Sequence, residues 1–441
     1  MSLPTLPTVQ ELQRALHAKA KESPAFRFYT LYDKIYRKDV LWCAWRRCLI
    51  NGGAPGEDEQ TFEEIERYGV TKWMDELAEE LRTKQYQPQA VRRVYIPKPD
   101  GKQRPLGIPT IKDRVVETAA LIVLEPIFEA DLQPEQYAYR EGHSAQAAVK
   151  AVHQLLIAGY REVVDADLSG YFDSIPHAEL MQCVARRVSD KAVLHLIKLW
   201  LVAPVEEKDS RGRRHRTTRN KDEGRGSPQG APISPLLANL YMRRFVLGWK
   251  VLGHQRALQA CIVNYADDFV ICCRRNADQA MQAMRDMMTR LKLTVNETKT
   301  HVCRVPDESF DFLGYTFGRG YAPRTGQPYI GARPSQKKVA RLRRAISEQT
   351  SARWGLADPE EIVERLNLMI RGWANYFSYG SVSRAYRAVD YHARERLRQW
   401  LCRKHKVDGR GTARFPLQYG YQKLGLIELR VQRRKLPRAN A

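Results

Sequence analysis

The sequence predicts a mixed α/β (α+β) fold: a large N-terminal body of helices and antiparallel strands, followed by an all-helical C-terminal module. Runs rich in β-branched and aromatic residues recur around 91–110, 161–168 and 261–271, each beside turn residues. Between these runs the apolar residues have helical spacing, and from about residue 335 onward only helical spacing remains. The 441 residues suffice for two or three domains with sizeable cores.

The expected elements alternate along the body of the chain. Helices predominate up to residue 90, with a Gly/Pro-rich break at 51–56, and the run at 91–110 is expected to be a hairpin. The further elements expected are, in order, helices up to about 131 and at 143–158, a strand at 161–168, helices at 177–200 and 232–248, a hairpin at 261–271, a helix at 277–291 and strands at 293–304 and 310–317. The Arg-rich stretch 206–225 is predicted to be an exposed hairpin tip or loop, with its role left open.

The charge of the chain indicates a polyanionic partner. Lys and Arg number 73 against 50 Asp and Glu, which gives a net charge of +23 and a pI near 9.7. Residues 331–441 hold 25 Lys and Arg against 9 Asp and Glu, so +16 of that charge lies in the last quarter. Such a distribution is typical of nucleic-acid-binding proteins, although basic ribosomal and housekeeping proteins share it. We therefore expect a basic helical module that binds nucleic acid.

The cysteines and the N-terminus indicate an intracellular protein. The eight cysteines show no C-x-x-C pair, so reduced, mostly buried thiols are expected rather than disulfides or a zinc site. The first residues lack the apolar segment of a signal peptide, and no apolar run reaches the length of a membrane span. We expect a soluble, cytoplasmic protein.

Two adjacent carboxylates, Asp267 and Asp268, are the most informative feature of the sequence. They follow Tyr265 and Ala266 inside an apolar run, which predicts a buried hairpin with the carboxylates at or near its turn. Burying a charged pair is unfavourable unless a cation neutralises it, and Mg²⁺ is bound by one or two carboxylates together with substrate phosphates. A metal site and a plain hairpin turn both fit this segment taken alone.

A second acidic segment lies about a hundred residues earlier in the chain. An apolar strand leads into Asp165, Asp167 and Asp173. Phosphoryl transfer by two metal ions requires one carboxylate that bridges both ions and another on a neighbouring strand. Asp167 beside the hairpin of Asp267 and Asp268 would supply that arrangement, while Asp165 and Asp173 are alternatives that spacing does not rank.

These segments, taken in order with the Gly/Pro-rich junction at 226–240, resemble the blocks of group II intron-encoded reverse transcriptase/maturases of the bacterial type. The resemblance runs from about residue 51 to the C-terminus, and it departs from the family at His143, where an Arg is expected. The matching blocks are 53–56 (N-terminal extension loop), 95–99, 104–109 and 112–114 (fingers), 137–144, 167–172 (motif A), 227–230 (motif B), 265–268 (motif C), 293–299 and 310–315 (last palm blocks), and 372–377 (thumb or X domain).

The resemblance implies a right-hand polymerase, with a palm built on an antiparallel sheet, fingers, and an all-α thumb/maturase (X) domain. The implied domains are an N-terminal extension at 1–60, reverse transcriptase fingers and palm at 61–320, the thumb/maturase X domain at 330–405, and a basic DNA-binding tail at 406–441. A C-terminal endonuclease domain is not expected, because the last segment lacks paired cysteines and a His-Asn-His pattern. The enzyme is therefore expected to need a nick or a replication fork as the source of its primer.

The resemblance also implies the catalytic residues. It assigns metal binding to Asp167, Asp267, Asp268 and the backbone carbonyl of Leu168, with two Mg²⁺ ions, or Mn²⁺ as a substitute. It assigns protonation of the leaving pyrophosphate to Lys299.

Nucleotide-binding residues follow from the same blocks. The resemblance assigns grip on the incoming triphosphate to Lys98 and Arg104, and contact with the sugar or base of the nucleotide to Gln229. It assigns exclusion of a ribose 2′-hydroxyl, and hence the preference for dNTPs, to Phe172. Tyr171 is the alternative if the register is off by one.

The implied function is that of an RNA-directed DNA polymerase that binds group II intron RNA, assists its splicing and copies it into DNA at a nicked or replicating target site (retrohoming). Its partners would be intron RNA, an RNA template–DNA primer duplex, target DNA and dNTPs, with nucleoid association when bound to DNA. The first alternative is a domesticated relative that acts in DNA repair or phage defence; Ala266 favours the intron-borne type. The second is an RNA-binding splicing factor without polymerase activity, which the three intact aspartates oppose.

Overall fold

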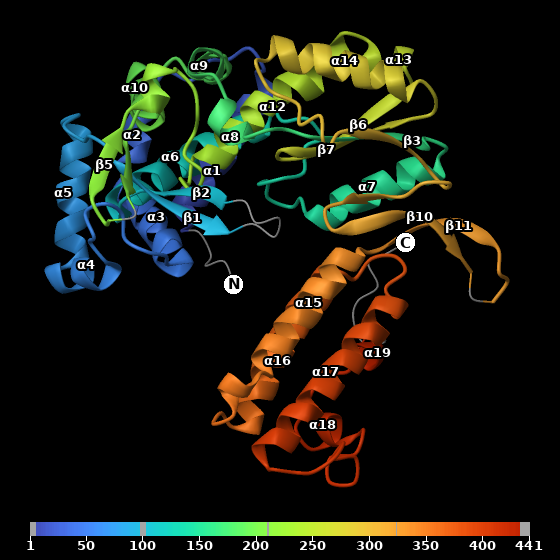
Figure 1. Cartoon of the computed structure of the whole chain (residues 1–441). Coiled ribbons are helices and arrows are strands. Elements are labelled where there is room, and N and C mark those ends of the chain that lie inside the picture. The colour runs from blue at the N-terminus through green and yellow to red at the C-terminus, as the bar shows by residue number, and fades with distance from the viewer. Residues whose placement is uncertain (1–5, 98–102, 210, 323, 433–441) are drawn as a thin grey trace.

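A mixed α/β body carries an elongated bundle of helices at its C-terminal end (Figure 1). The computed structural model describes residues 6–97, 103–209, 211–322 and 324–432. The strands are β1 (Val91–Pro97), β2 (Gln103–Ile108), β3 (Glu162–Asp167), β4 (Val205–Lys208), β5 (Arg214–Thr217), β6 (Ala260–Tyr265), β7 (Asp268–Cys273), β8 (His301–Arg304), β9 (Phe310–Phe312), β10 (Tyr315–Tyr321) and β11 (Pro328–Pro334). Within the described residues they form three sheets.

Helices surround these sheets and make up the C-terminal part. In the body they are α1 (Pro7–Glu22), α2 (Tyr32–Ile35), α3 (Lys38–Asn51), α4 (Phe62–Tyr68), α5 (Val70–Arg82), α6 (Ile111–Glu129), α7 (Ala145–Ile157), α8 (Tyr171–Ser174), α9 (His177–Ala185), α10 (Lys191–Leu201), α11 (Arg219–Asp222), α12 (Ser234–Val251), α13 (His254–Ala257) and α14 (Ala277–Arg290). In the C-terminal part they are α15 (Gln336–Gln349), η1 (Ala352–Trp354), α16 (Pro359–Tyr376), α17 (Ser383–Lys404), α18 (Tyr419–Gln422) and α19 (Leu429–Gln432). The expected mixed α/β class, with mainly antiparallel sheets and a helical C-terminal region, is confirmed.

The central sheet has the strand order β6-β7-β3-β8, and all of its pairs are antiparallel. Successive side chains of a strand point to opposite faces of the sheet. On β3, Val163 belongs to one buried cluster and Val164 to another, and on β7 the same division separates Val270 from Phe269. Both faces of this sheet are therefore covered.

One face packs on helices and the other on a helix and a smaller sheet. Phe245 of α12 contacts Phe269 of β7 with ring centroids 5.2 Å apart. On the opposite face Val149 and Val152 of α7 and Phe317 of β10 join Val270 in one cluster. Figure 1 shows this layering, with α12 and α14 on one side of the sheet and α7, β10 and β11 on the other.

The Arg-rich stretch 206–225 forms the β4–β5 hairpin followed by α11, so the predicted hairpin is present. Its arginines are not merely solvated. Arg216 forms an ion pair with Glu57 at 2.8 Å, Arg214 pairs with Glu59, and both arginines lie within 4 Å of Glu206. Glu57 also accepts a hydrogen bond from the backbone N–H of Ala90 at 2.7 Å. The hairpin thus holds the loop after α3 against the sheet whose order is β2-β1-β4-β5.

The C-terminal helices share one core and are anchored on the smallest sheet, β11-β10-β9. At the end of α16 the Tyr376 hydroxyl donates to the carbonyl of Leu313 at 2.8 Å, and the Tyr315 hydroxyl donates to the carbonyl of Tyr376 at 2.8 Å. Beyond residue 405 the described chain continues to pack on this core, through the buried side chains of Phe415 and Leu429.

Several expected details differ in the structure. The single helix expected at 177–200 is two helices, α9 and α10, because the Asp190 side chain accepts hydrogen bonds from the N–H groups of Ala192 and Val193 and so begins a new helix. The strand expected at 310–317 is likewise divided, into the antiparallel pair β9 and β10.

The strand expected at 293–304 is limited to His301–Arg304, because backbone bonds from Lys299 and Thr300 to the Asn296 carbonyl form a turn before it. β11 was not expected from the sequence; it pairs with β10 and immediately precedes the helical part. Among the described helices none is both long and apolar enough to cross a membrane.

Candidate active site

The Asp267 and Asp268 pair lies at a tight hairpin turn. β6 ends at Tyr265 and β7 begins at Asp268, so Ala266 and Asp267 form a two-residue turn. Ala266 has a φ of 57°, the left-handed conformation that such a reversal of the chain requires. The buried Asn264 side chain donates from Nδ2 to the Ala266 carbonyl at 2.8 Å and so fixes the turn. Asp267 is thereby held in the turn, and Asp268 is the first residue of the ladder.

The strand register distinguishes Asp167 from the two alternatives. Asp167 on β3 lies directly opposite Asp268 on β7, whereas Asp165 lies opposite Val270, farther from the turn. Directly opposed residues on one face of an antiparallel pair have Cβ atoms about 4.5–5.5 Å apart. Asp173 lies beyond the strand in α8. The register therefore brings Asp167, and not its neighbours, beside the turn carboxylates. Leu168 follows with a buried side chain and forms an isolated bridge with Val295.

Burial and the neighbouring carboxylates raise the pKa of Asp268. The surrounding protein limits hydration of the Asp268 carboxyl, although part of this residue faces solvent. This desolvation is the largest cause of the shift, and the negative charges of Asp267, Asp167 and Asp165 add to it. Together they raise the pKa of Asp268 to about 7. Burial likewise raises the pKa of Asp165 to about 6, with His301 opposing the shift. The site concentrates negative charge that a cation would stabilise.

Lys299 lies inside this site. Its Nζ is 3.0 Å from Oδ2 of Asp167, and the same oxygen accepts a hydrogen bond from Nδ2 of Asn296 at 3.0 Å. The Asn296–Thr300 turn places both side chains there, because the Asn296 N–H donates to the Asp167 carbonyl at 2.8 Å. The ammonium predicted to act on the leaving group is thus held against one of the metal-binding candidates.

A cavity of about 630 Å³ opens beside the turn. Its wall includes Asp267 together with Arg104, Phe172 and Gln229, three of the four residues assigned to nucleotide binding. The volume lies in the range of small-molecule sites. The fourth residue, Lys98, lies outside the described residues.

Phe172, rather than Tyr171, faces this cavity. Tyr171 is 2% exposed, and its hydroxyl donates to the Ala238 carbonyl at 2.6 Å in the core behind the strand. Phe172 is half-buried and lines the cavity. Phe172, and not the alternative Tyr171, is therefore the aromatic residue on the cavity wall.

The loop before α12 is fitted against β2. The N–H of Gly107 donates to the Gln229 carbonyl at 2.6 Å, which leaves the Gln229 side chain on the cavity wall. Gly230 has a φ of 117°, and a Cβ there would overlap the carbonyl oxygen of Gly107. The N–H of Ser227 donates to the Phe172 carbonyl at 2.8 Å. The loop therefore links the segment that carries Phe172 to the β1–β2 hairpin that carries Arg104.

The carboxylates fit a divalent cation whose remaining ligands come from the substrate and from water. Among the described residues no group of three or more His, Cys, Asp or Glu side chains is placed to hold a metal ion unaided. Mg²⁺ usually keeps several waters and takes one or two carboxylates plus substrate phosphates. The opposed Asp167 and Asp268, with Asp267 on the adjoining cavity wall, match that requirement.

Sequence reasoning missed other residues of the cavity. Tyr139 lines it with a φ of 55°, and Arg114 lines it while donating to the carbonyls of Gly52 and Ala54 at 3.1 and 3.0 Å. Both residues lie in sequence blocks that resemble the family, but their spacing did not predict that they would line the same cavity as Phe172.

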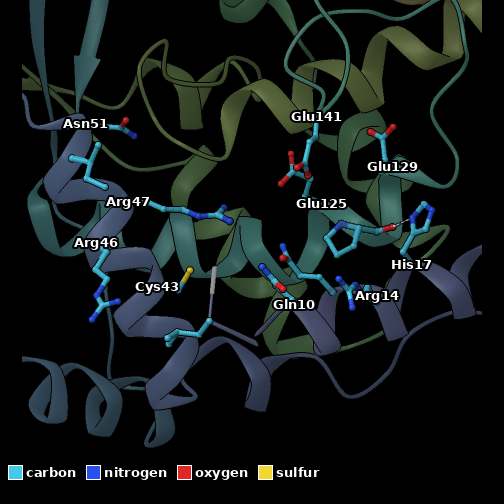
Figure 2. A pocket seen from close by; sticks show the side chains of 14 residues that line it. Gln10, Arg14, His17, Cys43, Arg46, Arg47, Asn51, Glu125, Glu129 and Glu141 are labelled. Carbon is cyan, nitrogen blue, oxygen red and sulfur yellow. Dashed lines mark hydrogen bonds between the residues drawn. The ribbon is translucent and has the colours of Figure 1, made fainter. Parts of the chain in front are cut away.

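Arg47 of α3 also lines this cavity and a neighbouring one of about 840 Å³. Figure 2 shows Arg47 extending from α3 toward Glu125 and Glu141 in that second cavity. Burial raises the pKa of Glu125, and Arg47 opposes the shift. The N-terminal helices therefore contribute to the walls of the site region.

Two family models match the chain. "Reverse transcriptase (RNA-dependent DNA polymerase)" matches residues 96–317, and "Group II intron, maturase-specific domain" matches residues 339–416. The chain belongs to the group II intron type of reverse transcriptase/maturase. This family generally uses divalent metal ions such as Mg²⁺, and its domains are those of RNA-directed DNA synthesis, intron RNA binding and assistance to splicing.

Individual relatives agree with this assignment. Protein YkfC of Escherichia coli (strain K12) is 33% identical, with 70% of this chain and 87% of YkfC covered. The group II intron-encoded protein LtrA of Lactococcus lactis subsp. cremoris is 32% identical over 56% of this chain, and the alignment spans only 39% of LtrA. A solved chain from "Partial Cas6-RT-Cas1--Cas2 complex" aligns over 59% of this chain and 42% of its own with 24% identity, and its TM-score of 0.36 is too low to support a structural comparison.

Proposed function

We propose that this chain copies group II intron RNA into DNA at a nicked or replicating target site, after assisting the splicing of that RNA. The observation that carries the proposal is the meeting of two features: Asp167 opposed to Asp268 in the central sheet, and a cavity that Asp267 shares with Arg104, Phe172 and Gln229. Neither a splicing factor nor a plain hairpin turn requires an acidic turn that opens onto a cavity of nucleotide size.

In this proposal Asp167, Asp267 and Asp268 hold two Mg²⁺ ions, with the Leu168 carbonyl as a further ligand. When bound, the ions lower the pKa of the primer 3′-hydroxyl and neutralise the triphosphate. The protein contributes positioning and electrostatics, which account for most of the catalysis of phosphoryl transfer.

The residues on the cavity wall orient the nucleotide. Arg104 offers a planar fork of donors to the triphosphate, and Lys98, six residues earlier in the sequence, contributes a further charge. The Phe172 ring occupies the space that a ribose 2′-hydroxyl would need, so dNTPs are preferred. Gln229, whose backbone is fixed on Gly107, contacts the sugar or base. Lys299, beside Asp167, supplies a proton to the leaving pyrophosphate.

The helical part would hold the template–primer duplex. Lys337, Arg341 and Arg344 are exposed and lie on one face of α15, opposite the buried Leu342 and Ile346. A basic helix face binds the backbone of an A-form duplex with little regard to sequence. We propose the domain roles accordingly: N-terminal extension at 1–60, fingers and palm at 61–320, thumb/maturase X domain at 330–405 and a DNA-binding segment at 406–441.

Primer extension tests the central claim. The purified chain with Mg²⁺ should add dTMP to oligo(dT) annealed to poly(rA), and Asp267→Asn should add none. The absence of incorporation by the wild-type chain would overturn the polymerase assignment and leave an RNA-binding splicing factor. A group II intron domain V hairpin downstream of the gene would support the intron-borne type, and its absence would favour a domesticated enzyme.

A further inference from the structure

A third pocket lies on the side of the central sheet away from the carboxylates. Its volume is about 320 Å³, and it lies between α9 and α12 near the end of α6. α12 packs on the face of the sheet that bears Phe269. The side chain of Asp167 points to the opposite face, since it alternates with Ala166, which belongs to the cluster on the α12 side. Figure 1 likewise shows α9 and α12 on the side of the sheet away from the C-terminal helices.

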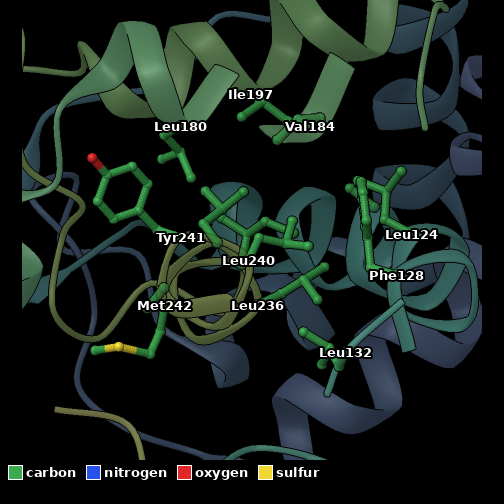
Figure 3. Close-up of a cluster of buried hydrophobic side chains, with 14 of the residues drawn as sticks. Leu124, Phe128, Leu132, Leu180, Val184, Ile197, Leu236, Leu240, Tyr241 and Met242 are labelled. Carbon is green, nitrogen blue, oxygen red and sulfur yellow. The ribbon is translucent and has the colours of Figure 1, made fainter. Parts of the chain in front are cut away.

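The pocket has a rigid apolar floor. Phe128 and Leu240 line it and are 1% and 4% exposed. Figure 3 shows the core to which they belong, with Leu180 and Val184 of α9 pointing toward the α12 side chains. The polar side chains at the rim come from α9 and its C-cap residue Arg186, from α12, and from Asp131 after α6.

The rim is rich in arginine. Arg186, Arg243 and Arg244 line the pocket, and in the described part of the chain none of the three forms an ion pair with a carboxylate. Arg243 is positioned by a hydrogen bond from its Nε to the Asp131 carbonyl at 2.7 Å. Arg244 lies over the Tyr241 ring, 5.3 Å from its centroid.

The two carboxylates of the rim already have partners of their own. Asp131 lies 3.3 Å from Nε of Arg187, and Glu179 lies 2.5 Å from Nζ of Lys292. Asp131 also interacts with Arg243, and Glu179 with Arg244, so three guanidinium groups face two carboxylates that already have the cationic partners Arg187 and Lys292. Burial lowers the pKa of Arg243; Asp131 opposes this shift and Arg186 adds to it, and a bound anion would favour the charged guanidinium.

We infer that this pocket binds a phosphodiester of an RNA strand that lies outside the polymerase cleft. Guanidinium groups match phosphate oxygens with paired donors, and the apolar floor suits the adjoining sugar. The inference rests on the proposed function, because a chain that both copies an RNA and holds structured parts of it needs contacts on more than one face. It goes beyond that function by placing one of those contacts on α9 and α12.

The matched pair of variants is R186Q/R244Q for the pocket and R256Q/R290Q as the control. Each variant removes two positive charges, and Arg256 and Arg290 are exposed residues that do not line the pocket. The full chain is first saturated with poly(rA)/oligo(dT), so that the cleft is filled. A short fluorescein-labelled hairpin RNA is then titrated against it at several KCl concentrations, and its binding is followed by fluorescence anisotropy.

We expect R186Q/R244Q to weaken binding of the hairpin RNA by at least about tenfold at low salt and to reduce the slope of log Kd against log [KCl] by about 1.4 to 1.8, as the loss of two phosphate contacts requires. R256Q/R290Q should bind within about twofold of the wild type, and primer extension should be unchanged in both variants. Equal affinity of wild type and R186Q/R244Q would overturn the inference. The single variant R186Q repeats the test should the double variant fold poorly, since Arg186 is exposed.

A free anion is the competing occupant. If inorganic phosphate raises the Tm of the wild type but not of R186Q/R244Q, while the hairpin RNA binds both equally, the pocket takes a small phosphate and the RNA assignment is wrong. Failure of primer extension in the wild type would remove the proposed polymerase function without affecting the hairpin titration, so the two failures are distinguishable.

Discussion

Gly230 is the position at which the fit between the loop before α12 and the fingers can be tested most directly. Its backbone has a φ of 117°, and the nearest atom to an added Cβ is the carbonyl oxygen of Gly107, followed by Cδ1 of Leu106 at 3.1 Å. Gly230→Ala therefore introduces an unfavourable backbone conformation and a contact that no real Cβ makes with a backbone oxygen. The loop must retreat from β2.

The magnitude follows from what the retreat disrupts. A non-glycine residue in such a conformation is strained by about 1–3 kcal/mol. Loss of the 2.6 Å hydrogen bond from Gly107 to Gln229 adds about 1 kcal/mol. The total of about 2–4 kcal/mol favours displacement of the loop over unfolding of a chain of this size. Because Gln229 and Arg104 line one cavity from the two sides of this contact, their displacement should lower kcat/KM for a dNTP by about 10- to 100-fold.

The assay is steady-state addition of a single dNTP to a primer on an RNA template, with affinity for the template–primer measured separately. Gly253→Ala is the matched control, since Gly253 also has a positive φ (82°) but no atom within 4 Å of an added Cβ. This control should retain wild-type kcat/KM. If Gly230→Ala also stays within twofold of the wild type, the loop does not depend on its contact with β2, and the reasoning is refuted.

Three further outcomes are expected. Asp267→Asn should abolish DNA synthesis and leave RNA affinity in a filter-binding assay within about threefold, because that affinity rests on distributed positive charge; a collapse of RNA binding would indicate a structural role. Phe172→Ala should raise the incorporation of rNTPs relative to dNTPs at least about tenfold in single-nucleotide extension, and unchanged sugar discrimination would show that another residue excludes the 2′-hydroxyl. Glu117 is 3% exposed, and burial, followed by the charge of Asp113, raises its pKa from 4.5 to about 8, so the folded chain keeps a proton that the unfolded chain releases. The free energy of unfolding should therefore fall as pH rises from 4.5 to about 8. Urea denaturation of the wild type should show a loss of about 2–3 kcal/mol in this free energy between about pH 6 and pH 9, and Glu117→Gln should remove that loss. Parallel pH profiles of the two proteins would contradict the pKa shift.

Much of the site was predictable because its carboxylates lie in short apolar segments that can be recognised in the sequence. The turn at Asp267 and Asp268 follows from two flanking runs of β-branched residues, and the structure has it at the predicted position. Most helix and strand limits between 143 and 291 were predicted to within a few residues, since most of these elements have one dominant periodicity, but the break between α9 and α10 at 186–190 was not predicted. The turn that shortens the strand expected at 293–304 was not visible, because Asn296 and Thr300 act there through backbone bonds.

The ranking among Asp165, Asp167 and Asp173 required the register of β3 on β7, a contact between segments about a hundred residues apart. The choice of Phe172 over Tyr171 required knowing that the Tyr171 hydroxyl is bound inside the core. Lys299 presents the same limit, since its spacing gave no sign that it would contact Asp167.

The sequence by itself determined the family, the order of the blocks, the acidic turn and the basic C-terminal helices, because each of these depends on residues close together in the chain. The tertiary structure alone decided which aspartate faces the turn, which aromatic residue lines the cavity, that Arg214 and Arg216 hold the N-terminal loop, and that three arginines meet behind the sheet. Those features depend on strand register and helix packing between distant segments, and spacing along one chain carries no information about either.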